Sequence, residues 1–515
     1  MGAGPRIAAE LAGELVIAAL PGPRLDAESD ALLRDGCASG VCLYGRNVED
    51  PSQLRALTDA IRERIGQDAL VCCDLEGGYV WRLKAPATHW PSAMAFGAAD
   101  RPDLTRRAAT MAAREMRAMG IDAPFAPVAD VSDHPRNPVI ATRAFGGLAT
   151  HVSRHVTAAI GGYREGGVAS CAKHFPGHGH TDVDSHHALP VVNHDHTRLD
   201  SIDLVPFLSA VRAGVDMVMV SHLLVMAIDA GMPASMSPAV VTGLLRQRLG
   251  FRGVIVTDAL DMRAITDAYG LAEAAVRAIA AGCDLATFNA PIGTAREVHT
   301  AITAAIESGR LPESQVRASV ARIRALRRSL ARNPRPTLAT VGDQSHVAIA
   351  DEVARLALTA TGDAIPLLSR APGPTVVVEF DPRLPFTDPN IHPPTTRLAD
   401  ALALRQVTAH AHVMAPKAWT AQAPSILAEV RTARRVIVAT RNAWRDQEQR
   451  EALLAVSAET TDLTVVALRD PHDAMIMPAG RNALTYADDP SSIRAAVSWL
   501  LDGAPAPGTV PVALS

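Results

Sequence analysis

Short apolar runs typical of buried strands alternate with stretches of helical periodicity from the start of the chain to about residue 330. Helix-compatible segments such as 51–65 and 106–119 follow these runs. This repetition predicts βα units, in which helices cover a parallel sheet. The eight strand-like runs are 15–20, 40–44, 69–74, 125–130, 167–173, 217–221, 253–258 and 283–288. Eight units fit a (β/α)8 TIM-type barrel over residues 1–335 better than a doubly wound sheet, although an open sheet with insertions would give the same pattern.

The pattern changes near residue 335, which predicts a domain boundary. The segment 310–329 still has helical spacing, but 336–346 follows two prolines and has no periodicity, as expected of a linker. Beyond it, residues 347–515 begin with a helical segment and continue with β-type runs separated by helical stretches. These runs are 375–380, 407–413, 435–440 and 463–468, with helical stretches such as 424–434 and 447–456. The pattern predicts a smaller α/β (αβα) sandwich as the second domain.

Composition and charge exclude several classes of partner. Lys and Arg number 50 against 54 Asp and Glu in 515 residues, so the net charge of −4 gives no general attraction to nucleic acid or to an anionic membrane. The six cysteines show no CxxC or zinc-ribbon spacing, which favours buried free thiols in a reducing compartment.

The start of the chain lacks the features of an export signal. Glu10 and Glu14 interrupt its apolar stretch, and no run of about 18 apolar residues occurs elsewhere. We therefore expect a soluble cytoplasmic protein. The sequence gives no indication of the oligomeric state, because it contains no heptad repeat or one-sided charge pattern.

Histidines are concentrated in one loop after a predicted strand. Seven of the 18 histidines lie between residues 174 and 196. Two chemistries fit this cluster. The side chains of His174, His178, His180, Asp182, Asp184 and His186 could bind zinc, iron or manganese. Alternatively, one histidine shuttles a proton beside an aspartate, as the spacing of Asp184 and His186 allows. A third interpretation, for His178, His180 and His187, is that they only hydrogen-bond the backbone and hold a long loop in shape.

Carboxylates also follow predicted strands. Asp258 ends the apolar run 253–258, and the carboxyl end of a barrel strand opens onto the active-site face, so Asp258 is a candidate nucleophile or base. It could instead cap the helix that follows. Asp74 ends another run, and Arg82 lies where it could hold a hydroxyl or carboxylate, although a surface ion pair would look the same. Arg143 follows a proline-broken loop in segment 133–146.

Taken together, these segments resemble glycoside hydrolase family 3, and within it the two-domain β-N-acetylglucosaminidase branch. The resemblance rests on DLEGGYVWRL at 74–83, FAPVADV at 125–131, NPVIATRAFG at 137–146, KHFPGHGHTDVDSHHALP at 173–190 and GFRGVIVTDALDM at 250–262. It covers the first domain. The loop KHFPGHG followed by DSH is the most specific of these motifs.

The resemblance implies a role for each matching residue. Asp258 would be the nucleophile that forms a covalent glycosyl-enzyme intermediate, His186 the general acid/base, and Asp184 its partner. The residues implied to bind the sugar ring are Asp74, Arg82, Arg143, Lys173 and His174. No metal or other cofactor is implied, and the second domain is expected to supply no catalytic residue.

The resulting hypothesis is a retaining exo-β-N-acetylglucosaminidase that acts on saccharides such as peptidoglycan fragments. A phosphorylase is the first alternative, because a neutral acid/base would let an anionic phosphate approach the intermediate. A metal-dependent TIM-barrel hydrolase that uses the histidine cluster is the second.

Overall fold

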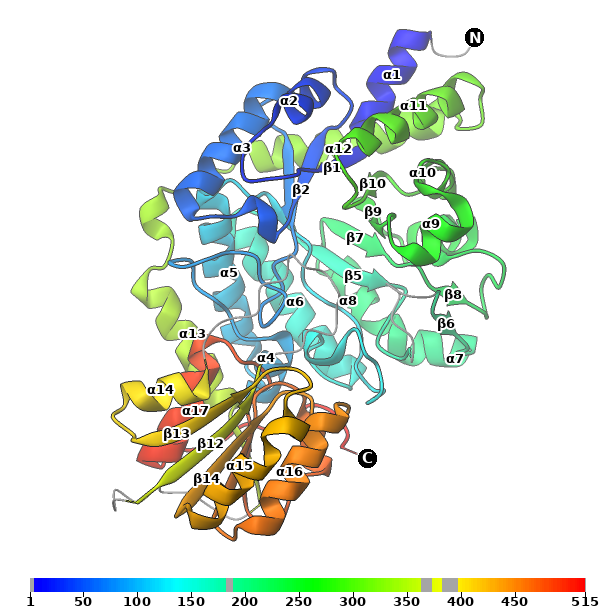
Figure 1. Cartoon of the computed structure of the whole chain (residues 1–515). Coiled ribbons are helices and arrows are strands. Elements are labelled where there is room, and N and C mark those ends of the chain that lie inside the picture. The colour runs from blue at the N-terminus through cyan, green and yellow to red at the C-terminus, as the bar shows by residue number, and fades with distance from the viewer. Residues whose placement is uncertain (1–3, 182–188, 363–372, 382–396, 515) are drawn as a thin grey trace.

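The computed structural model describes residues 4–181, 189–362, 373–381 and 397–514. Its first domain is an eight-stranded sheet in the order β4-β3-β2-β1-β10-β9-β7-β5, and all of its strand pairs are parallel (Figure 1). The strands are β1 (Val16–Ala19), β2 (Gly40–Leu43), β3 (Leu70–Cys73), β4 (Ala123–Pro124), β5 (Cys171–Phe175), β7 (Met217–Val220), β9 (Val254–Ala259) and β10 (Leu285–Thr287). Each corresponds to one of the eight predicted runs, displaced by a few residues at β4 and β5.

The barrel closes between β4 and β5 through the chain that follows β4. The Ala129 N–H donates to the Lys173 carbonyl at 2.6 Å, and the Lys173 N–H donates to the Pro127 carbonyl at 3.2 Å. Val128 and Lys173 form a parallel bridge. These bonds replace a long β4 strand, and the predicted barrel is confirmed.

Helices surround the sheet because their apolar faces pack on its outer side chains. They are α1 (Pro5–Glu14), α2 (Ala27–Arg34), α3 (Pro51–Ile65), α4 (Ala93–Ala99), α5 (Pro102–Ala118), α6 (Ala149–Gly166), α8 (Val205–Arg212), η5 (Ala239–Arg248), α9 (Arg263–Tyr269), α10 (Leu271–Ala281), α11 (Gly293–Glu307) and α12 (Glu313–Ala331). Helix α3 shows how local sequence sets an element: the Asp50 side chain accepts the N–H groups of Ser52 and Gln53, and Gly66 follows the last turn. Leu54, Leu57 and Ile61 bury its inner face.

The second domain is a six-stranded sheet in the order β11-β16-β15-β14-β12-β13. Its strands are β11 (Thr359–Gly362), β12 (Thr375–Phe380), β13 (Ala409–Met414), β14 (Arg435–Thr440), β15 (Leu463–Ala467) and β16 (Arg481–Leu484), and its flanking helices are α14 (Leu398–Leu404), α15 (Trp419–Thr432), α16 (Gln447–Glu459) and α17 (Pro490–Asp502). Alternate side chains face opposite layers: Val377 and Ile437 pack with α14 and α17, and Val376 and Val436 pack with α15 and α16. The predicted αβα sandwich is confirmed (Figure 1).

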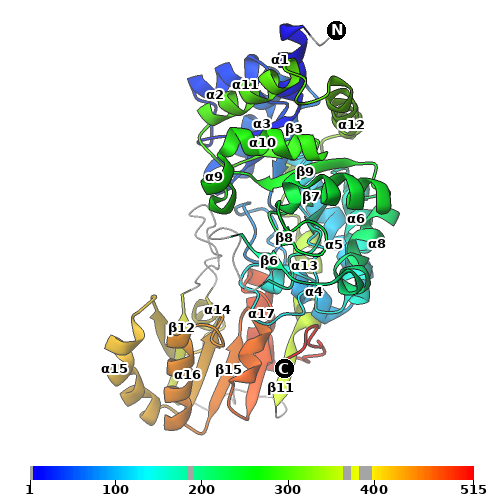
Figure 2. The ribbon, with the colours of Figure 1, turned by 90° about the vertical axis from the view of Figure 1, so that its right-hand side faces the viewer.

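Helix α13 (Gln344–Ala357) lies between the two domains. It packs on α4 and α5 of the barrel and on α17 of the second domain (Figure 2). Its His346 Nδ1–H donates to the buried Glu115 carboxylate at 2.7 Å, which ties α13 to the barrel. The predicted linker 336–346 contains a short 3-10 turn at Leu338–Thr340 and the first residues of α13.

All six cysteines are buried and unpaired. Burial raises the pKa of the Cys42 thiol to about 12, so it stays protonated and unreactive at neutral pH. Within the described part of the chain, no helix has both the length and the apolar character needed to cross a bilayer.

Candidate active site

Charged side chains gather at the carboxyl ends of the barrel strands, where TIM-barrel enzymes place their active sites. Asp74 follows β3, Lys173 and His174 lie on β5, and Asp258 lies near the end of β9. The closed barrel therefore brings together predicted residues that are up to 184 positions apart in the sequence.

Lys173 is the centre of a buried charge cluster. Its Nζ lies 2.7 Å from Asp74 Oδ1 and 2.6 Å from Glu76 Oε1, and only 1% of the residue is exposed. Burial alone would lower the pKa of Lys173, but the carboxylates of Asp74 and Glu76 outweigh it and raise the pKa. Lys173 is therefore a fixed cation.

Arg143 completes this cluster from the loop after β4. Its Nε and Nη2 donate to the two carboxylate oxygens of Glu76 at 2.7 and 2.8 Å. Such a bidentate pair fixes the relative orientation of the guanidinium and carboxylate planes. Burial would raise the pKa of Glu76, but Arg143 and Lys173 hold it far below its ordinary value. Glu76 is therefore ionised and rigidly placed.

The His174 ring is held on both sides. Its Nδ1–H donates to Asp130 Oδ2 at 2.7 Å, and Arg143 Nη2 donates to its Nε2 at 3.1 Å. The backbone N–H groups of His174 and His178 also donate to the Asp130 carboxylate, the latter at 2.7 Å. Asp130 thus determines the orientation of His174 and of the loop that begins there.

Asp258 is kept ionised by its surroundings. Burial would raise its pKa, but the basic side chains of His174, His222 and Lys173, with the backbone N–H of Ala259, bring it down to about 2. That N–H donates to Asp258 Oδ1 at 2.8 Å. Asp258 does not cap the next helix: α9 has Met262 as its N-cap residue and receives no side-chain capping bond. The capping interpretation is therefore wrong, and the carboxylate is available for chemistry.

Arg82 is buried beside this cluster, with Nη2 at 4.0 Å from Asp74 Oδ2. Only 4% of its side chain is exposed, so the interpretation as a surface ion pair is wrong.

The histidine loop lies partly outside the described residues. Asp182, Asp184, His186 and His187 fall within 182–188, so the dyad expected of Asp184 and His186 has no described geometry. The rings of His178 and His180 bond to Thr181 Oγ1 and to Asp133 Oδ1, at 2.9 and 2.8 Å. The third interpretation expects bonds to the backbone, whereas these two are bonds to side chains; they nevertheless hold the start of the loop in place.

Three residues of the site were not singled out from the sequence: Glu76, Asp130 and His222. His222 Nε2–H donates to the Ala259 carbonyl at 3.1 Å, beside Asp258, and its Nδ1 bonds to Ser235 Oγ at 2.7 Å. Asp130 ends a predicted strand run and His222 immediately follows another, so position at a strand end was the available signal.

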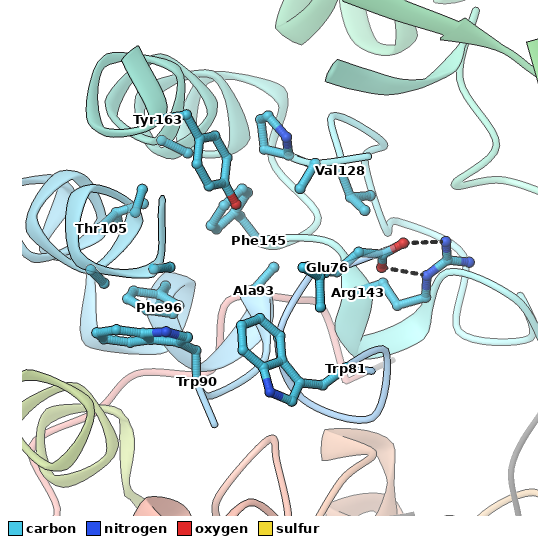
Figure 3. A pocket seen from close by; sticks show the side chains of 18 of the residues that line it. Glu76, Trp81, Trp90, Ala93, Phe96, Thr105, Val128, Arg143, Phe145 and Tyr163 are labelled. Carbon is cyan, nitrogen blue, oxygen red and sulfur yellow. Dashed lines mark hydrogen bonds and ion pairs between the residues drawn. The ribbon is translucent and has the colours of Figure 1, made fainter. Parts of the chain in front are cut away.

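A cavity of about 50 Å³ lies behind the Glu76–Arg143 pair, between the barrel and α4, α5 and α6. Figure 3 shows the pair at one side of the cavity and the rings of Trp81, Trp90 and Phe145 around it. Most of its lining is apolar, so the ion pair separates this space from the polar site.

The second domain contacts the barrel loops that carry these residues. Arg445 Nη1 donates to the Asn137 carbonyl at 2.5 Å, and its Nη2 donates to the Pro135 carbonyl. The Arg469 guanidinium lies over the Tyr79 ring, 5.3 Å from its centroid. The second domain thus supports the loops before Arg143 and after Asp74.

Residues 9–326, more than half of the chain, match the model of the glycosyl hydrolase family 3 N-terminal domain. The chain belongs to glycoside hydrolase family 3. The resemblance seen in the sequence motifs is confirmed, and with it the assignment of the chain as a glycoside hydrolase.

Several relatives of the chain carry the name β-hexosaminidase. The chain is 33% identical to β-hexosaminidase A of Pseudoalteromonas piscicida over 350 residues, which cover 62% of this chain and 58% of that protein. It is 40% identical to a β-hexosaminidase of Chromobacterium violaceum over 261 residues, covering 50% and 72% of the two chains. The chain thus spans less than two thirds of the first of these relatives.

One solved structure matches both domains. The family 3 β-N-acetylglucosaminidase from Paenibacillus sp. str. FPU-7 superposes with a TM-score of 0.92 at 32% identity, over 98% of this chain and 99% of that one. The two-domain architecture is therefore shared over its full length.

Proposed function

We propose that this family 3 enzyme hydrolyses terminal, non-reducing β-linked N-acetylglucosamine from saccharides. The observation that carries the proposal is the ionised Asp258 carboxylate at the open end of a barrel lined by Asp74, Lys173 and His174. The β-hexosaminidase relatives and the Paenibacillus β-N-acetylglucosaminidase support the choice of sugar.

In the proposed mechanism, an Asp258 oxygen attacks the anomeric carbon while the glycosidic bond breaks. The leaving oxygen takes a proton from His186, which Asp184 orients. This first step produces the glycosyl-Asp258 ester. In the second step His186, now neutral, removes a proton from water as that water attacks the same carbon. Asp258 leaves as a carboxylate, so the two inversions give net retention.

The buried charge cluster supplies the proposed contacts to the sugar. Asp74, Lys173 and His174 offer acceptors and donors whose positions are fixed by their neighbours. Arg143 positions His174 from behind, and Arg82 supports Asp74. Because the groups are already ordered, little entropy is lost when hydroxyls bind.

The natural substrate and location are narrower proposals. We propose small peptidoglycan fragments as substrates and the cytoplasm as the location. The six unpaired, buried thiols are consistent with a reducing compartment.

Release of nitrophenol from the β-N-acetylglucosaminide and the β-glucoside, each with and without phosphate, tests the proposal. We expect preference for the N-acetyl substrate, no dependence on phosphate, and a first product with the β configuration by proton NMR. An α-configured first product would contradict retention.

A phosphorylase is the second candidate, because the proposed acid/base is a histidine that adds no negative charge opposite phosphate. Formation of N-acetylglucosamine 1-phosphate in the same assay would assign that reaction. Activity lost on chelation and restored by zinc would instead favour the metal-dependent hydrolase.

A further inference from the structure

Two histidines and an aspartate meet where α4 ends and α6 begins, on the outside of the barrel. His151 and His155 are four residues apart on α6, so they lie on one face of the helix. Asp100 immediately follows α4. His151 Nδ1 and His155 Nε2 lie 3.6 and 3.7 Å from Asp100 Oδ1, and the three ligand atoms fall within 4.8 Å of one another.

His155 aims a buried, unpartnered nitrogen at Asp100. The residue has no exposed surface, and its Nδ1 lies 2.8 Å from Thr105 Oγ1, which itself donates to the Arg101 carbonyl. When Nδ1 carries the ring proton and donates it to Thr105 Oγ1, Nε2 presents its lone pair toward Asp100 and can bind a metal ion. Within the described residues, Nε2 has no hydrogen-bond partner. The Phe145 ring stacks on His155 at 5.2 Å and holds this orientation (Figure 3 shows Phe145 and Thr105).

We propose that Asp100, His151 and His155 bind a divalent transition-metal ion, with zinc as the preferred ion. Ligands about 2.1 Å from a tetrahedral zinc lie about 3.4 Å from one another, close to the two nitrogen–oxygen distances. Two imidazoles and one carboxylate suit zinc better than magnesium or calcium.

The guanidinium of Arg154 occupies the place between Asp100 and His151 where the metal ion would bind. One of its nitrogens, Nη2, lies 2.9 Å from Asp100 Oδ1 and 3.0 Å from His151 Nδ1. The side chain is half exposed, so it can swing into solvent when an ion binds. A metal must therefore displace the guanidinium, and removing Arg154 strengthens metal binding.

The site lies beside the contacts between the C-terminal segment and the barrel, where Ala98 and Val512 belong to one apolar cluster. The Thr509 N–H donates to the Ala98 carbonyl at 3.1 Å, and the Gly147 N–H donates to the Pro511 carbonyl at 2.9 Å. A bound ion would fasten α4 to α6 directly beside this C-terminal segment. Its effect is on stability and not on the chemistry at Asp258.

Cobalt(II) and zinc titrations of the full chain test the proposal without an activity assay. Cobalt in a tetrahedral histidine and carboxylate site gives an intense visible absorption. We expect that band in the wild type, and an apparent affinity at least about tenfold lower in Asp100→Asn and His151→Ala, because even outer partners of metal ligands contribute 10- to 100-fold. Zinc should raise the Tm of the wild type and not that of these two variants.

Controls separate this site from other histidines. His412→Ala alters the partly exposed cluster of His410, His412 and Glu429, and should leave the band unchanged. Arg154→Ala should tighten cobalt binding, whereas Arg164→Ala, an exposed arginine further along α6, should not. The proposal is overturned if the wild type gives no band, if Asp100→Asn and His151→Ala bind as the wild type does, or if only His412→Ala loses the band. His151 and Asp100 are partly exposed, so these variants should remain folded, as circular dichroism will check.

Discussion

At Asp258, burial and neighbouring charge act in opposite directions, and charge prevails. The pKa of about 2 means that the carboxylate is already ionised throughout the working range of an enzyme. The protonation of Asp258 therefore does not limit the rate, and any pH dependence of turnover arises from another group.

We predict that Asp258→Asn lowers kcat by about 10³-fold or more, because the amide cannot form the glycosyl ester. The fold should persist, as judged by an unchanged Tm. The matched control is Asp267→Asn, an exposed aspartate on α9, which should keep wild-type turnover. An Asp258→Asn enzyme with near-normal kcat would remove this residue from the mechanism.

The pH profile of kcat/KM is a second residue-scale prediction. Since Asp258 is ionised above about pH 3 and His186 must donate a proton, the rate should hold its plateau on the acid side and fall on the alkaline side, as the acid loses its proton. A substrate with a dinitrophenyl leaving group needs no proton, so its profile should lose this fall. A fall on the acid side between pH 4 and 6, with the enzyme still folded, would contradict the assignment of Asp258.

Lys173→Met removes the cation between Asp74 and Glu76. Two carboxylates then face each other in a buried site, and we expect the free energy of unfolding at pH 7 to fall by about 3–5 kcal/mol. Because the pKa of Glu76 is lowered in the folded protein, its contribution is complete above its unfolded pKa of about 4.5 and is lost at lower pH, so the deficit should shrink as pH falls below that value.

Urea unfolding at pH 7 and pH 4 measures this difference. Lys84→Met is the matched control, because Lys84 is exposed, and its free energy of unfolding should be that of the wild type. Equal deficits for Lys173→Met at both pH values would show that packing, and not charge, is lost.

At the scale of elements, sequence periodicity predicted those strands whose side chains are buried on both faces. The runs at 40–44 and 217–221 are continuous apolar stretches because helices cover one face and the barrel interior the other. Strands β11 and β16 were missed, since Thr359–Gly362 forms an edge and Arg481–Leu484 contains polar residues. The two strands pair with each other across more than 100 residues of sequence, and a local sequence pattern holds no information about such a distant partner.

The same limit applies to the site. Asp258 and Lys173 could be predicted because each lies at a strand end or in a specific motif. Glu76 could not, because its role comes from Arg143 and Lys173, 67 and 97 positions away. Asp130 ends a predicted strand run and so could have been singled out, but its bond to the His174 ring exists only once the barrel has closed.

Helix α4 offers a packing prediction. A Cβ at Gly97 would lie 1.7 Å from the Phe145 carbonyl oxygen, which belongs to the backbone. Gly97→Ala should therefore lower the free energy of unfolding by about 2 kcal/mol or more. Gly231→Ala, where the nearest atom lies 3.7 Å away, is the control and should change little. A neutral result at Gly97 in urea unfolding would show that α4 can shift.

At the scale of the whole molecule, the second domain acts on the site through a loop. Arg445 bonds to the carbonyls of Pro135 and Asn137, in the loop that leads to Arg143. Loss of these bonds should loosen Arg143 and, through it, His174.

We therefore predict that Arg445→Ala lowers kcat/KM by about tenfold, since small misplacements of positioned groups have large effects on rate. Arg431→Ala removes an exposed pair with Glu459 on the far helices and should leave kcat/KM unchanged. If both variants keep wild-type kcat/KM, the contact between domains has no part in positioning Arg143.

Lys173 has two partners of different kinds. Its backbone closes the barrel against Pro127 and Ala129, and its side chain neutralises Asp74 and Glu76. The backbone pairing that closes the barrel is thus the one that brings the Lys173 ammonium to Asp74 and Glu76. A chain whose barrel is still open lacks this charge cluster, so any damage to the β4–β5 closure costs the molecule its polar site as well as its stability.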